Sequence, residues 1–195
     1  MEGSLADTPE EWMRRYAAGD IDAFEQLYRH LSPKVFGYLL RLTRQRQRAE
    51  DLVQITFSKV HRSRHSYLTG APVLPWLLAI ARRSFYDEYR RDKTRPEELS
   101  ADGALPEPAL VASGLEPDLA DALDQALSRL PRTYAEAIEL TKVTGLSLAE
   151  AAAVLGASKT AVKLRVHRGY VLLRQELEAQ AGSHHGPDRD QKVTP

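Results

Sequence analysis

The chain has 195 residues, 43% of them hydrophobic, and its 27 Lys and Arg balance 27 Asp and Glu for a formal net charge of +0. This length allows one mid-sized domain or two small ones, and the absence of cysteine excludes a disulfide scaffold, a cysteine nucleophile and any Cys-ligated zinc or iron–sulfur site. No apolar run approaches the roughly 20 residues of a bilayer span, and the first residues lack a signal-peptide pattern, so we expect a cytoplasmic protein without membrane insertion.

The charges are segregated along the chain. Residues 96–128 hold eight acids and no Lys or Arg, whereas residues 158–174 hold five basic residues and no acid. Further basic clusters occur at residues 41–48 and 82–95. Local basic surfaces on a neutral protein favour a polyanionic partner, although solvated helix faces explain the pattern equally well.

Helical periodicity dominates the first half. Residues 12–16 predict a short helix that ends at Gly19, and an apolar stripe over residues 24–42 predicts a longer one, with Ser32-Pro33 as either a new helix start or a kink. Two more helices are predicted, around residues 52–60 and from Pro75 to about Arg91, with a loop between them. No segment alternates with the period of a strand.

A segment rich in Pro, Gly and acidic residues divides the chain. Residues 96–117 cannot bury enough apolar area to offset their ordering entropy, so we predict a flexible acidic linker. The predicted fold class is therefore all-α, with two small helical domains at residues 8–95 and 118–180 and a disordered tail at residues 181–195.

The second domain contains the most informative motif. Ser147 and Glu150 have the spacing of a capping box that opens a short, alanine-rich helix, Gly156 suits the left-handed position after it, and Ser158 suits the next N-cap. A longer basic helix follows, to about residue 178. This layout is typical of a DNA-binding helix-turn-helix, and a plain αα-hairpin with a solvated basic face is the weaker alternative.

Two separate sets of segments carry a family resemblance. They are residues 23–28, 49–57 and 76–82 in the first half, and residues 130–132 and 155–168 in the second. In the family pattern AEDLVQETF, which residues 49–57 match, Ile55 replaces a glutamate. Together the segments resemble regions 2 and 4 of the extracytoplasmic-function (ECF) sigma factors of the bacterial sigma-70 family, over about residues 10–95 and 118–178 and in the family's order.

The resemblance implies a transcription initiation factor that is not an enzyme and needs no cofactor. It would direct core RNA polymerase to specific promoters and help to open the DNA strands. The implied partners are core RNA polymerase, through its β′ clamp helices and its β flap, promoter DNA and an anti-sigma factor.

Three sets of residues are expected to carry these roles. The residues expected to bind the minus-thirty-five element as duplex DNA are Ser158, Lys159, Thr160, Lys163, Arg165, His167 and Arg168. The residues expected to bind the partly single-stranded minus-ten element are Arg64, His65, Ser66, Tyr67, Arg82, Arg83, Tyr86, Arg90 and Arg91. For Tyr67, a place in the apolar core is about as well supported. The residues expected to bind core RNA polymerase are Asp51, Gln54, Ile55 and Phe57.

Two other classes of protein were weighed. A free-standing regulator that binds operator DNA as a dimer explains the second domain but leaves residues 49–57 without a role. An enzyme is disfavoured because the six histidines show no catalytic arrangement and the chain has no Walker or Rossmann glycine loop. A weak metal contact at His184-His185 is far less favoured than a solvated pair, so no metal site is expected.

Overall fold

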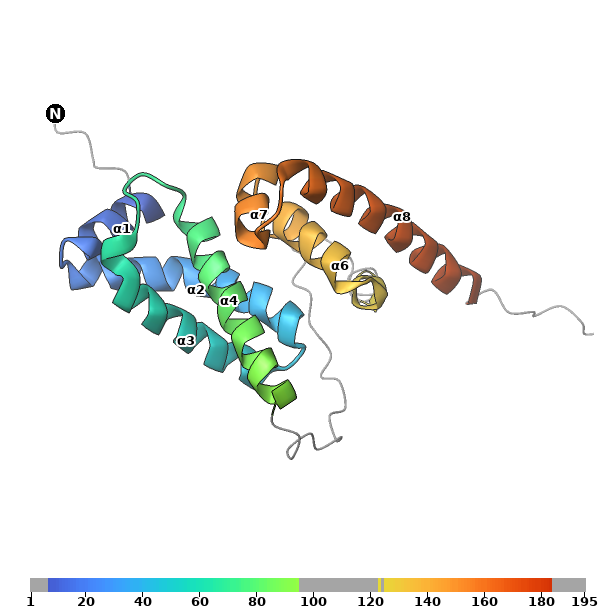
Figure 1. The fold of residues 1–195 in the computed structure, drawn as a ribbon, viewed down its shortest axis with the longest axis horizontal. Coiled ribbons are helices and arrows are strands. Elements are labelled where there is room, and N and C mark those ends of the chain that lie inside the picture. The colour runs from blue at the N-terminus through green and yellow to red at the C-terminus, as the bar shows by residue number, and fades with distance from the viewer. Residues whose placement is uncertain (1–6, 95–122, 124, 184–195) are drawn as a thin grey trace, which may run out of the picture.

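The computed structural model describes residues 7–94, 123 and 125–183 (Figure 1). The described residues are mostly helical, as predicted, and contain no strand. The first half contains α1 (Pro9–Ala17), α2 (Ile21–Thr43), α3 (Arg46–Ser63), the short 3-10 helix η1 (Arg64–Ser66) and α4 (Val73–Thr94). The second half contains a helical turn at residues 125–129, then α6 (Arg132–Ile138), the π-helical segment η2 (Glu139–Val143), α7 (Leu148–Leu155) and α8 (Lys159–Ser183). The predicted linker lies outside the described residues.

The first domain is a four-helix arrangement around one apolar core. Tyr16, Leu27, Tyr38, Leu52 and Leu77 are each at most 1% exposed and come from α1, α2, α3 and α4. Burial of each large apolar side chain contributes about 1.5–3 kcal/mol, so packing of these side chains holds the four helices together.

Local capping sets where the first helices begin. The Thr8 hydroxyl accepts a hydrogen bond from the Glu11 backbone N–H at 3.3 Å, and the Asp20 carboxylate accepts one from Ala23 at 3.1 Å. Between its ends α2 continues through Pro33 without a break. Of the two readings of Ser32-Pro33, a new helix start is therefore wrong, because packing of the buried stripe on both sides of Pro33 outweighs the one lost backbone bond.

The second domain is smaller and is joined directly to the first. Leu130, Ile138 and Leu173 form its own core, and α6 packs against α8. The helices approach closely at Gly169, where an added Cβ would lie 2.7 Å from Ile138 Cδ1. On its other side α7 packs against α4 of the first domain, as the neighbouring green and orange helices in Figure 1 show.

Two further findings concern the ends and the surface of the fold. α8 continues through Ser183, three residues into the segment predicted as tail, and the rest of that segment lies outside the described residues. Within the described part of the chain, no helix is both long and apolar enough to span a membrane.

Two glycine substitutions test how the backbone is built. Gly156 has φ 61° with open space around its Cα, whereas Gly37 is helical and its added Cβ would make only an ordinary 3.5 Å contact with Arg41. We expect Gly156→Ala to destabilise the protein by about 1–2 kcal/mol, since a Cβ strains the left-handed conformation. Gly37→Ala should stabilise it by about 1 kcal/mol.

The measurement is urea unfolding of the full chain, followed by helical circular dichroism. Loss of stability in both variants, or in neither, would contradict the assigned backbone conformations.

Candidate nucleic-acid and polymerase interfaces

A helix-turn-helix is formed by α7 and α8. The Ser147 hydroxyl accepts from the Glu150 N–H at 3.2 Å, and the Glu150 carboxylate accepts from the Ser147 N–H at 2.8 Å, which confirms the capping box. α7 ends at the left-handed Gly156, and the Ser158 hydroxyl accepts from the Ala161 N–H at 3.1 Å as α8 begins. These short-range bonds fix the direction in which α8 leaves the turn.

The first turns of α8 separate a buried face from a basic one. Val162 and Val166 are buried, at 0% and 9% exposure, against the domain. The residues predicted for the minus-thirty-five element lie on the solvent side, with Arg165 half-buried and the others exposed: Ser158, Lys159, Thr160, Lys163, His167 and Arg168. The structure thus brings hydroxyl and cationic groups together on one surface.

The residues of the loop between α3 and α4 that are predicted to bind the minus-ten element differ in how exposed they are. His65 and Ser66 are exposed on η1, and Arg64 is half-buried. Tyr67 is 7% exposed, with its ring 5.3 Å from that of Trp76 and its hydroxyl donating to the Ala71 carbonyl. Burial, together with the charge of Glu10, raises the pKa of Tyr67 to about 12, so the hydroxyl stays neutral.

Leu68 is the apolar surface that this loop presents. Its side chain is 76% exposed, the highest value among the exposed large hydrophobic residues of the described chain. Leu68 belongs to the loop at residues 64–69 in which an unpaired strand is expected to bind. The sequence alone does not show that Leu68 is exposed and its neighbour Tyr67 buried, because this depends on packing across the loop.

On α4, the predicted minus-ten residues form one cationic face. Arg83, Arg90 and Arg91 are exposed, while Arg82 and Tyr86 are half-buried. The Arg82 guanidinium lies 4.7 Å from the centre of the Tyr86 ring, a cation–π contact that orders both side chains.

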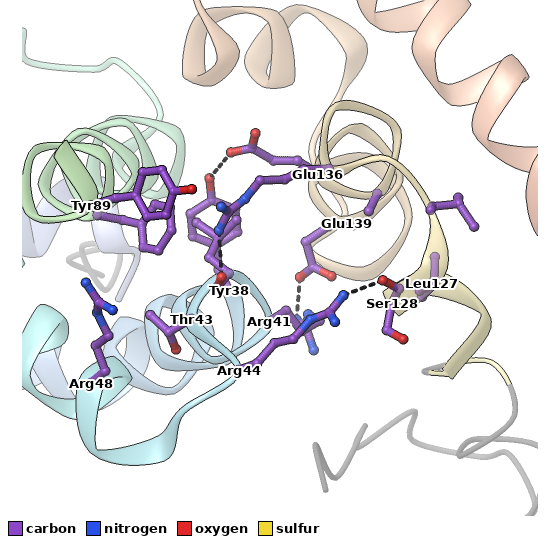
Figure 2. Close-up of a pocket in the computed structure, with 15 residues that line it drawn as sticks. Tyr38, Arg41, Thr43, Arg44, Arg48, Tyr89, Leu127, Ser128, Glu136 and Glu139 are labelled. Atoms are coloured by element: carbon purple, nitrogen blue, oxygen red, sulfur yellow. Dashed lines mark hydrogen bonds and ion pairs between the residues drawn. The ribbon is translucent and has the colours of Figure 1, made fainter. Parts of the chain in front are cut away.

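This face does not point only to solvent, because Glu136 of α6 reaches it. Glu136 is 4% exposed, and its carboxylate accepts from the Tyr38 hydroxyl at 2.7 Å (Figure 2). The same carboxylate accepts from Arg82 Nε at 2.8 Å. Tyr86 adds a longer contact, with its hydroxyl 3.5 Å from the same carboxylate. Burial, and then the charge of Glu136, raise the pKa of Tyr38 above its ordinary range. Sequence reasoning missed Glu136, which has the pattern of an ordinary helical glutamate.

More bonds join the two domains around a cavity of about 420 Å³. Arg41 forms an ion pair with Glu139, and Arg44 donates to the Ser128 carbonyl at 2.5 Å, as Figure 2 shows. From the second domain, Arg132 donates to the Leu42 carbonyl at 2.6 Å, and its guanidinium lies 4.3 Å from the centre of the Phe85 ring. These polar contacts are rich in arginine. Beside them, buried apolar residues of the second domain, among them Leu140, Val154 and Leu155, belong to the same core cluster as those of the first domain.

The predicted polymerase surface lies on α3. Asp51 and Gln54 are exposed one turn apart, and Ile55 beside them is 41% exposed. Phe57 is instead 4% exposed, with its ring 4.7 Å from that of Tyr28. Three of the four residues are thus available to a partner, and Phe57 supports the helix from the core.

Comparisons with known proteins agree with both halves of this description. A family model described as Sigma-70 region 2 matches residues 27–95, and one described as Sigma-70, region 4 matches residues 120–173. The chain is 38% identical over 165 residues to the RNA polymerase sigma factor CarQ of Myxococcus xanthus, covering 85% of this chain and 95% of CarQ.

Two more proteins extend the comparison. The chain is 32% identical over 174 residues to the ECF RNA polymerase sigma factor SigF of Caulobacter vibrioides, covering 87% and 94% of the two chains. Among solved structures, the sigma factor RpoE of Bartonella quintana, in complex with the anti-sigma factor NepR, aligns with a TM-score of 0.70 at 27% identity. That alignment covers 81% of this chain and 98% of RpoE.

Proposed function

This chain belongs to the sigma-70 family as an ECF-type RNA polymerase sigma factor, which acts with RNA polymerase at promoters in transcription initiation, and on that premise we propose which of its surfaces makes each contact. The observation that carries the assignment is the pair of basic surfaces on separate domains, one on α8 and one on α4. Two surfaces on two domains suit a protein that contacts two promoter elements at once.

The N-terminal half of α8 reads the minus-thirty-five element as duplex. Ser158, Lys159, Thr160 and Lys163 are exposed in its first turns, where a helix that enters the major groove by its N-terminus meets base edges. Arg165, His167 and Arg168 lie further along the helix and contact phosphate, which positions the protein but reads no sequence.

The loop between α3 and α4, together with α4 itself, binds the minus-ten element, which is partly single-stranded. Arg83, Arg90 and Arg91 supply charge for the phosphates, and Arg82 joins them once its bond to Glu136 is broken. His65 and Ser66, with the exposed Leu68, offer surface to an unstacked base. Tyr67 shapes this loop from within, since its ring is packed on Trp76.

The exposed side of α3 binds the β′ clamp helices of core polymerase. Asp51 and Gln54 offer polar groups and Ile55 an apolar one, on a helix held firmly by its buried face. The second domain would contact the β flap. By analogy with RpoE, which was solved with the anti-sigma factor NepR, we propose that an anti-sigma factor restrains this chain too. It acts in the cytoplasm with the polymerase and performs no chemistry itself.

Replacing Lys163 and Arg165 by alanine tests the α8 assignment. We expect promoter-directed run-off transcription to fall, because Lys163 meets base edges. The slope of log K against log salt for holoenzyme binding should decrease by about 0.9, for the one phosphate contact that Arg165 makes. The matched control is Arg29→Ala with Lys34→Ala, which removes two cations from α2. An equal loss in the control, or an unchanged slope in the α8 variant, would contradict the assignment.

Replacing Asp51 and Gln54 by alanine tests the polymerase surface. We expect affinity for core polymerase to fall by about tenfold or more, because hydrogen bonds to charged groups contribute about 1.5–3 kcal/mol. Fluorescence anisotropy of labelled protein against core polymerase measures the change, with Gln175→Ala on the exposed side of α8 as control. Wild-type affinity in the double variant would place the polymerase contact elsewhere.

A further inference from the structure

We propose that the cavity between the two domains is a binding site for a small organic anion, a molecule with an aromatic body and a carboxylate, sulfonate or phosphate head group. Its volume of about 420 Å³ lies in the range of pockets that bind small molecules, and such pockets are common at domain interfaces. The proposal does not depend on which surfaces of the chain contact DNA or polymerase.

Both domains build the walls of the cavity (Figure 2). The first domain contributes Leu42 at the end of α2 and Phe85 on α4. The second contributes Leu127, Leu130 and, on α6, Ala135. These apolar side chains offer a surface to an aromatic body, which gains free energy when it leaves water.

The charges on the walls favour an anion over a cation. The charged side chains that line the cavity are four arginines and two glutamates: Arg41, Arg44, Arg48, Arg132, Glu136 and Glu139. Both glutamates are compensated, since Glu136 accepts from Arg82 and Glu139 forms an ion pair with Arg41. Arg48 is compensated as well, by Glu88 at 3.4 Å and by Asp92. Two positive charges, those of Arg44 and Arg132, are left over.

Arg44 and Arg132 are held by neutral groups. Arg44 donates to the Ser128 carbonyl at 2.5 Å, and Arg132 donates to the Leu42 carbonyl at 2.6 Å. Each of these bonds uses one of the five N–H donors of a guanidinium. A guanidinium bonds an anionic oxygen more strongly than a neutral carbonyl, so an anion in the cavity would gain from both cations.

Arg132 brings the cationic and the apolar parts of the site together. Its guanidinium lies 4.3 Å from the centre of the Phe85 ring and 6.0 Å from that of Tyr89. A single small molecule can therefore place its head group at Arg132 and its rings beside Phe85. An inorganic anion would leave the apolar wall uncovered, and this is why the site suits an aromatic acid better.

The class of ligand is tested on the full chain with anilinonaphthalene sulfonate, an aromatic anion that fluoresces when it leaves water. Its neutral counterpart is phenylnaphthylamine, which has the same rings and no sulfonate. Arg44→Gln with Arg132→Gln removes both charges, and glutamine keeps an N–H donor for each carbonyl. We expect this double variant to bind the sulfonate about tenfold or more weakly, and the neutral probe as the wild type does.

The matched control is Arg29→Gln with Lys34→Gln, which removes two exposed cations of α2 outside the cavity. It should leave the affinity for both probes unchanged. Unchanged affinity for the sulfonate in the cavity variant, or an equal loss for the neutral probe, would show that Arg44 and Arg132 do not select an anion, and would overturn the proposal.

The position of the site is tested on the wild-type chain with para-benzoylbenzoate, an aromatic carboxylate that attaches to nearby C–H bonds on illumination. Mass spectrometry of the digested protein locates the label. We expect it on cavity residues of both domains, such as Leu42 and Leu127, and we expect excess anilinonaphthalene sulfonate to prevent labelling.

Label confined to the apolar residues exposed on α8, such as Tyr170 and Val171, would show adventitious surface binding only and would overturn the proposal. Failure of the proposed function is separate, because that function is measured by promoter-directed transcription of the Lys163 and Arg165 variant, in which the cavity residues are unchanged.

Discussion

A buried carboxylate links the two domains of this sigma factor. Glu136 is 4% exposed, and a charge removed from water to that extent is stable only when it is paired and hydrogen-bonded. Its partners, Tyr38, Arg82 and Tyr86, all belong to the first domain. The need to satisfy this carboxylate therefore ties α6 to α2 and α4, together with the apolar cluster that both domains share. The contacts of Arg41 and Arg132 add to it.

The same constraint links the fold to its function. Arginine side chains pair with carboxylates inside the protein and with phosphates outside it, using the same planar donors. A chain with a net charge of +0 can thus carry cationic surfaces on two domains and pair one of their arginines, Arg82, with its own buried carboxylate.

Local features were predictable from the sequence, and the contacts between domains were not. The capping box at Ser147, the left-handed Gly156 and the N-cap at Ser158 depend on residues a few positions apart, and the structure confirms all three. Tyr67 was undecided, because its burial depends on Trp76 across the loop. Glu136 and Arg82 lie 54 residues apart, and no periodicity or spacing connects them. The roles of the residues on α3, α4 and α8 remain predictions that the structure makes geometrically possible.

The most direct measurement of the role of Glu136 follows the distance between the two domains in the full chain. Because the chain has no cysteine, Lys34→Cys on α2 and Gln175→Cys on α8 give two exposed dye sites for single-molecule energy transfer. The account predicts a high-efficiency population that shifts to lower efficiency in Glu136→Gln and is unchanged in Glu25→Gln, an exposed carboxylate on α2. The same high-efficiency population in Glu136→Gln would contradict the account, because the domains would then meet without this carboxylate.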